Sequence, residues 1–256
     1  MAAVDKPAAP EETGLRAHEV PPPCDSEGFP WLENGERMDQ KTFHERYAKL
    51  PPGFRAELVE GMVHLMPSPL GLHHARNDAE LSGCLFLYSA ATPGTTSQNN
   101  ATTILGVKSE PQPDSALLIR NDYGGQSRDG EGEANFTFGA PELLVEVALS
   151  SRSIDLNGKL RDYERAGVRE YVVYDLRERS LLAFERRGAR LEHALHDSDG
   201  VWRSRAFPGL WLDAAALASG DRAALVATLQ RGLASPEHVD FIAALEQRRA
   251  ALRENP

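Results

Sequence analysis

The sequence has 256 residues, of which 41% are hydrophobic and 26% charged, ordinary values for a globular protein with a substantial core. Its formal net charge of −10 argues against a protein that coats nucleic acid by bulk electrostatics. No apolar run approaches the ~20 residues of a membrane helix, and two cysteines are too few for a disulfide framework or a four-thiolate zinc site. We therefore expect no membrane partner and a reducing, cytoplasmic setting.

The first 40 residues have the composition of an extended arm. They hold six of the 17 prolines and nine acidic residues against three basic ones, with little periodic apolar pattern. We expect residues 1–40 to form a disordered acidic arm, residues 41–218 to form the folded domain, and residues 219–256 to add a helical tail.

The elements of the folded part follow from local patterns. A short helix begins near Asp39 and ends at Pro51, and a β-hairpin then turns at Glu60-Gly61. Further along, apolar periodicity predicts these segments: a helix over 73–90, strands over 102–107, 115–119 and 142–149, a helix over 155–166, strands over 170–175, 180–186 and 190–195, and helices over 221–232 and 236–253. The strand–helix–strand unit over 142–175 predicts a crossover and a partly parallel sheet. The fold class is α/β (α+β), with a mixed central sheet flanked by helices.

Glu146 occupies an unusual place in its predicted strand. Alternation puts Leu143, Val145 and Val147 on one face, and Leu144 and Glu146 on the other. A strand that is apolar on both faces is normally covered on both, so this carboxylate must be paired, hydrogen-bonded or bound to a metal. A structural ion pair and a functional role explain it equally well.

Three further residues belong beside Glu146. Asp114 follows Pro113 at the expected start of a strand, although an aspartate that forms a turn would give the same sequence pattern. Lys159 lies one helical turn after Asp155, where a surface ion pair is the ordinary interpretation. Glu57 lies on the first hairpin. Together, three carboxylates and a lysine are the groups that metal-dependent phosphodiester hydrolysis requires, because hard oxygen ligands suit Mg²⁺ and a lysine can assist the attacking water or stabilise developing charge.

Several motifs in order resemble the Uma2 family, also called DUF820, of the PD-(D/E)XK superfamily of restriction-endonuclease-like folds. They are Pro113-Asp114, PELLVEV (141–147), SSRSIDLNGKLRDY (150–163) and AGVREY (166–171), with the earlier run ELVEGMVHLMPSP (57–69) and the ending FPGLWL (207–212). The resemblance extends from about Thr42 to Leu217. It implies an endonuclease that uses Mg²⁺ or Mn²⁺ and acts on DNA.

The resemblance also implies roles for single residues. Asp114 and Glu146 would be metal ligands, and Glu57 would be a third acid. The superfamily's simple pattern has lysine two residues after the glutamate, where this sequence has Ala148. The resemblance to Uma2 therefore implies that Lys159, on the next helix, takes the role of this lysine. A long lysine side chain on a packed crossover helix can reach the strand.

Candidate DNA contacts are His73, which matches a family histidine, and the arginines Arg161 and Arg165. They belong to a basic stretch, since residues 150–190 hold ten basic residues against seven acidic ones. The ordinary interpretation of each is a solvated or paired surface residue. A homodimer would suit a duplex with two strands to cut.

Two functions fit these observations. The first is a Mg²⁺- or Mn²⁺-dependent DNA endonuclease in which Asp114, Glu146 and Lys159 are catalytic. The second is a catalytically silent module of the same fold that binds nucleic acid or protein, which the acidic charge and the lack of a helix-turn-helix or zinc-finger pattern favour.

Overall fold

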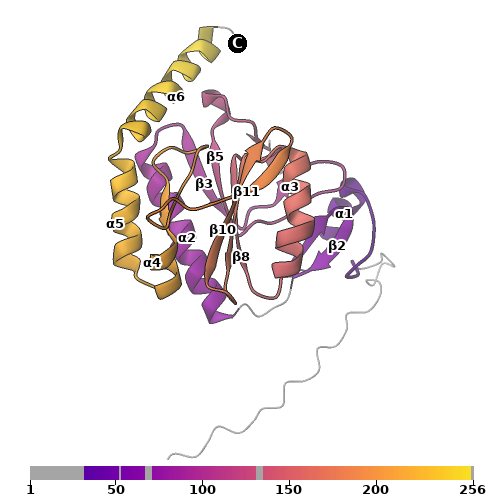
Figure 1. Cartoon of the computed structure of the whole chain (residues 1–256). Helices are drawn as coiled ribbons and strands as arrows, with labels where there is room; N and C mark the ends of the chain where they lie inside the picture. The colour runs from indigo at the N-terminus through magenta and orange to yellow at the C-terminus, as the bar shows by residue number, and fades with distance from the viewer. Residues whose placement is uncertain (1–31, 52, 67–70, 131–134, 255–256) are drawn as a thin grey trace, which may run out of the picture. The chain divides into compact units, whose positions relative to one another are not determined.

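A computed structural model of the chain describes residues 32–51, 53–66, 71–130 and 135–254 (Figure 1). Its central sheet has six strands in the order β11-β10-β9-β8-β5-β3. Their bounds are β3 Thr95–Asn99, β5 Ser115–Ile119, β8 Leu143–Ala148, β9 Glu170–Asp175, β10 Ser180–Arg187 and β11 Arg190–Ala194. Strands β8 and β9 pair in parallel and the four other neighbouring pairs are antiparallel. The predicted mixed sheet and its parallel crossover unit are confirmed.

Short strands form three further sheets. They are the hairpin β1 Ala56–Val59 and β2 Met62–Leu65, the pair β12 Val201–Arg203 and β13 Trp211–Asp213, and the group β4 Thr103–Ile104, β6 Arg128–Asp129 and β7 Thr137–Phe138. The hairpin turns at Glu60-Gly61, as predicted. The strand predicted over 102–107 is limited to the two residues of β4.

The helices are close to the predicted ranges. They are α1 Gln40–Tyr47, α2 Leu72–Ala91, a 3₁₀ turn η1 Asn121–Tyr123, a π-helical turn η2 Ile154–Lys159, α3 Leu160–Ala166, α4 Ala214–Ser219, α5 Arg222–Leu233 and α6 Pro236–Glu254. In the described part of the chain, no helix combines the length and the apolar character needed to cross a membrane.

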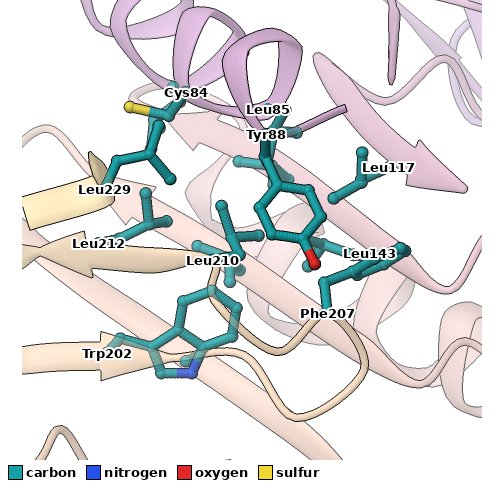
Figure 2. Packing of buried hydrophobic residues seen from close by; sticks show 14 of the residues in the cluster. Cys84, Leu85, Tyr88, Leu117, Leu143, Trp202, Phe207, Leu210, Leu212 and Leu229 are labelled. Atoms are coloured by element: carbon teal, nitrogen blue, oxygen red, sulfur yellow. The ribbon is translucent and has the colours of Figure 1, made fainter. Parts of the chain in front are cut away.

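Helices cover both faces of the central sheet (Figure 1). On one face, α2 packs with Leu117 and Leu143 of the sheet and with residues of α4 and α5 (Figure 2). On the other face, Tyr163 of α3 packs against Leu144 and Tyr171. Strand β8 is therefore buried on both sides, with all six of its residues inaccessible to solvent. This is the environment predicted for Glu146.

Contacts of residues 32–39 and of the C-terminal helices cross both predicted domain boundaries. Residues 1–31 of the expected arm lie outside the described residues. From Leu32 onward the chain contacts the β1–β2 hairpin. Leu32 is 3% exposed and packs in one cluster with Phe43 and Leu58. The Gly35 N–H then donates a hydrogen bond to the Val63 carbonyl. Residues 32–39 thus belong with the folded part. The helical tail also joins the main core, to which α5 and α6 contribute Leu225, Leu229 and Leu245.

Candidate active site

Two carboxylates lie side by side where β5 begins. Ser115, the first residue of β5, pairs with Val145 on antiparallel β8, so Asp114 lies one step further along, beside Glu146. The Val147 N–H donates to Asp114 Oδ2 at 2.7 Å, which holds this carboxylate against β8. The two acids that the sequence assigns to a metal ion therefore meet on neighbouring strands.

Lys159 lies among three carboxylates. It ends the π-helical turn η2, and 2% of its side chain is exposed. Its Nζ lies 2.9 Å from Glu146 Oε1, 3.0 Å from Glu57 Oε2 and 3.6 Å from Asp155 Oδ1. The lysine thus reaches the strand glutamate from the next helical segment, and the structure brings together all four residues that the sequence analysis singled out: Glu57, Asp114, Glu146 and Lys159.

Glu57 reaches this site from β1. The hairpin turn places Glu60 and Gly61 at φ values of 52° and 74°, which the tight turn requires and glycine readily adopts. Glu57 Oε1 accepts a bond from the Gln112 N–H at 2.6 Å, and Oε2 accepts from Lys159. Both oxygens of Glu57 are thus engaged by protein groups.

Two tyrosines that the sequence analysis left without a role complete the polar cluster. Tyr163 OH donates to Glu146 Oε1 at 2.9 Å, and Tyr171 OH donates to the Asp155 carbonyl at 3.2 Å. Their rings meet edge to face, with centroids 4.8 Å apart. The four-residue spacing from Lys159 to Tyr163 was the available signal, since it puts both on one face of a helical segment.

We expect Tyr163→Phe to lower the free energy of unfolding by about 1.5–3 kcal/mol, because it removes a buried hydrogen bond to a carboxylate. Tyr174→Phe is a matched control, since its hydroxyl donates at 3.3 Å to the neutral Leu217 carbonyl. Urea unfolding of both variants measures the difference. Equal losses of unfolding free energy in the two variants would show that the bond to the Glu146 carboxylate is no stronger than a bond to a neutral carbonyl.

His74, not His73, contacts the site. Its Nε2 lies 3.4 Å from Asp114 Oδ2, and the ion pair with Asp114 raises the pKa of the imidazole although burial opposes this. One turn later on α2, burial and the nearby Asp114 raise the pKa of Asp78 to about 6. His73 is exposed on the same helix. A DNA contact by His73 stays a prediction; the two adjacent histidines differ in the direction in which their side chains leave the helix.

The two predicted DNA-contacting arginines are held by acids. Arg161 Nη2 lies 2.5 Å from Glu60 Oε2, while Arg165 Nη2 lies 2.7 Å from Glu60 Oε1 and 2.6 Å from Asp162 Oδ1. The hydrogen bond from Arg161 is the main reason that the pKa of Glu60 falls to about 2. Both arginines remain more than half exposed, but their charge is already matched locally.

The charges of the buried cluster do not balance. Burial, together with the carboxylates of Asp155, Asp114 and Glu57, raises the pKa of Glu146 well above its usual value, although Lys159 opposes this. Burial lowers the pKa of Lys159, but the surrounding carboxylates raise it by more. Lys159 is therefore an ammonium that donates, and one positive charge faces the carboxylates of Glu57, Glu146 and Asp155, with Asp114 beside them.

The donor set fits a hard divalent cation. Asp155 is 1% exposed, and the Lys159 ammonium lies 3.6 Å from its Oδ1. An excess of buried carboxylates over buried cations is costly, so it favours a further cation. Among the described residues, no group of three or more His, Cys, Asp or Glu side chains is arranged to hold a metal. Mg²⁺ needs only one or two protein carboxylates when waters and a substrate phosphate supply the rest, a requirement that Asp114 and Glu146 would meet.

Comparisons with known proteins bear on the family and the fold. The family model Uma2, described as "Putative restriction endonuclease", matches residues 42–215. A crystal structure of a "putative nuclease belonging to DUF820" from Anabaena variabilis has a similar fold, with a TM-score of 0.52 and 16% identity over 68% of this chain and 96% of that chain. No curated protein matches.

Proposed function

This chain belongs to the Uma2 family, and from its site we propose that it is a metal-dependent endonuclease that hydrolyses phosphodiester bonds of DNA. The observation that carries the proposal is the buried cluster in which Glu57, Glu146 and Asp155 surround the ammonium of Lys159, with Asp114 beside Glu146 on the neighbouring strand. Four carboxylates beside one lysine suit the binding of a divalent cation and a phosphate.

The residues divide into two groups. Asp114 and Glu146 would hold Mg²⁺ or Mn²⁺, which polarises a phosphate oxygen and lowers the pKa of an attacking water. Lys159 donates hydrogen bonds from a fixed position, so it would orient that water or neutralise the charge that develops on the phosphate. Glu57 and Asp155 position Lys159, while Tyr163 positions Glu146. His74 faces Asp114 from α2 and orients it.

A nicking assay on supercoiled plasmid tests this function. We expect the purified protein to nick DNA with Mg²⁺ or Mn²⁺ and to stop when EDTA is added. Asp114→Asn, purified in parallel, controls for contaminating nucleases. Folded protein that leaves DNA and RNA intact with either metal would contradict the enzyme and favour the nucleic-acid- or protein-binding module.

The oligomeric state has a separate consequence. Two copies related by a two-fold axis would place one site at each strand of a duplex, and a homodimer stays a prediction for this chain.

A further inference from the structure

A hollow of about 320 Å³ lies beside the candidate active site. Four segments line it: the first half of α2, the ends of β8 and β9, the turn before β10, and the connection from α4 to α5. These segments come together at the lower edge of the central sheet in Figure 1, where α2 begins and β10 starts.

The hollow is next to the site along two segments of the chain. On α2, His73 lines the hollow while the adjacent His74 contacts Asp114. After β8, Leu149 lines the hollow three residues beyond Glu146. The hollow and the site thus lie at the same edge of the central sheet, where β5 begins and β8 ends.

The lining is positively charged in a protein of net charge −10. It contains Arg76, Arg179 and Arg222 against one carboxylate, Glu80. Arg222 is paired with Glu80 at 2.8 Å. Arg76 and Arg179 are exposed, and neither has an acidic partner within 4.0 Å among the described residues. Two guanidinium groups are thus available to an anion.

We infer that this hollow binds the backbone phosphates of the DNA strand next to the bond held at the candidate active site, with Arg76 and Arg179 as the contacting residues. The inference rests on the proposed nuclease function. A DNA strand carries one phosphate per ~3.4 Å of helix axis, so a strand at the site presents further phosphates close by. The planar guanidinium fork matches two phosphate oxygens, which makes arginine well suited to this contact.

A larger cavity of about 750 Å³ lies between the β1–β2 hairpin and α3, and it is the competing path for the strand. Two of its basic residues, Arg161 and Arg165, are engaged by Glu60 and Asp162. Arg37 and Lys108 also line it, are exposed and have no acidic partner within 4.0 Å among the described residues, so charge alone does not separate the two cavities. The smaller hollow is favoured by its place, because His73 lines it next to His74, which contacts Asp114.

The test measures binding and cleavage separately. Binding of a fluorescent DNA duplex is followed by anisotropy at several salt concentrations, in an Asp114→Asn background so that the duplex stays intact. Two matched controls are the double variant Arg161→Ala/Arg165→Ala and the single variant Arg187→Ala, which removes an exposed arginine at the opposite end of β10 from Arg179.

We expect Arg76→Ala/Arg179→Ala to weaken binding about tenfold or more and to reduce the salt slope by about 0.9 for each lost phosphate contact. With Asp114 restored, the same pair should raise the KM for plasmid nicking while changing kcat little. Arg187→Ala should bind like its parent.

Unchanged binding in the Arg76/Arg179 variant would overturn the inference, as would a loss that occurs only with Arg161 and Arg165 replaced. If the wild-type protein nicks DNA while the Arg76/Arg179 variant binds DNA normally, the nuclease function stands and the phosphate-binding role of the hollow is wrong. If the wild-type protein binds DNA through Arg76 and Arg179 without cutting it, the role of the hollow is supported and the catalytic function is contradicted.

Discussion

Replacing Lys159 by methionine is expected to lower the free energy of unfolding by about 3–5 kcal/mol, the usual cost of removing one partner from a buried ion pair. Methionine keeps most of the volume and the apolar stem but removes the ammonium. Glu57, Glu146 and Asp155 then remain buried without a cation between them. The loss is a large part of the 5–15 kcal/mol that typically stabilises a domain.

Urea unfolding followed by circular dichroism measures this loss, with Lys41→Met as the control. Lys41 lies on exposed α1, so its replacement should change stability by less than about 0.5 kcal/mol. The double variant Glu57→Gln/Lys159→Met removes one of the unpaired carboxylates and should recover part of the loss. A loss of less than about 1 kcal/mol in Lys159→Met would show that the ammonium does not hold the cluster together.

The central strands of the site could be predicted from the sequence because their pattern is local. Strand β8 is apolar on both faces, and this required burial on both sides, which makes the carboxylate of Glu146 stand out. Asp114 directly precedes a strand of clear apolar pattern, so pairing of that strand with β8 was enough to bring the two acids together.

Other parts of the site depend on tertiary contacts that no local pattern encodes. The segment predicted as an ordinary helix over 155–166 begins with the π-helical turn η2, which carries Asp155 and Lys159. The partners of Glu57 are Gln112 and Lys159, 55 and 102 residues further along the chain. The choice between His73 and His74 follows from how α2 packs, since both residues belong to the same turn.

The basic stretch over 150–190 shows the same limit. One dense run of arginines predicts a single basic face, but the strands separate them. Arg179 precedes β10 and Arg187 ends it, so the two side chains are separated by the length of that strand. Arg186 is bound to backbone carbonyls of Val168 and Glu164. Charge density along the sequence therefore overstated the charge density on any one surface.

Asp155 links the stability of the fold to the proposed chemistry. Its carboxylate is buried, which opposes folding, and the Lys159 ammonium lies 3.6 Å away. Natural proteins tolerate such strain mainly where function requires it. The excess negative charge that would make this cluster costly in an empty site is the same charge that would attract a divalent cation.

Asp114→Asn and Glu146→Gln should each reduce the rate of plasmid nicking by about 100-fold or more, because a metal contributes several kcal/mol of transition-state stabilisation and each 1.36 kcal/mol is a factor of ten. Both variants should stay folded. Asparagine can still accept from the Val147 N–H, and glutamine can still accept from Tyr163 and Lys159. Calorimetric titration with Mn²⁺ should show weakened metal binding in both.

Glu142→Gln provides the matched control for these two variants. Glu142 is fully buried just before β8, but its oxygens accept from the Ile119 and Gln126 N–H groups and it has no contact with Lys159 among the described residues. Its replacement should lower stability, since the amide nitrogen cannot accept the second bond, while the folded fraction keeps its nicking rate and metal binding. If Asp114→Asn and Glu146→Gln nick as fast as Glu142→Gln, these carboxylates serve only the fold, and the cluster around Lys159 is a structural ion pair rather than a catalytic site.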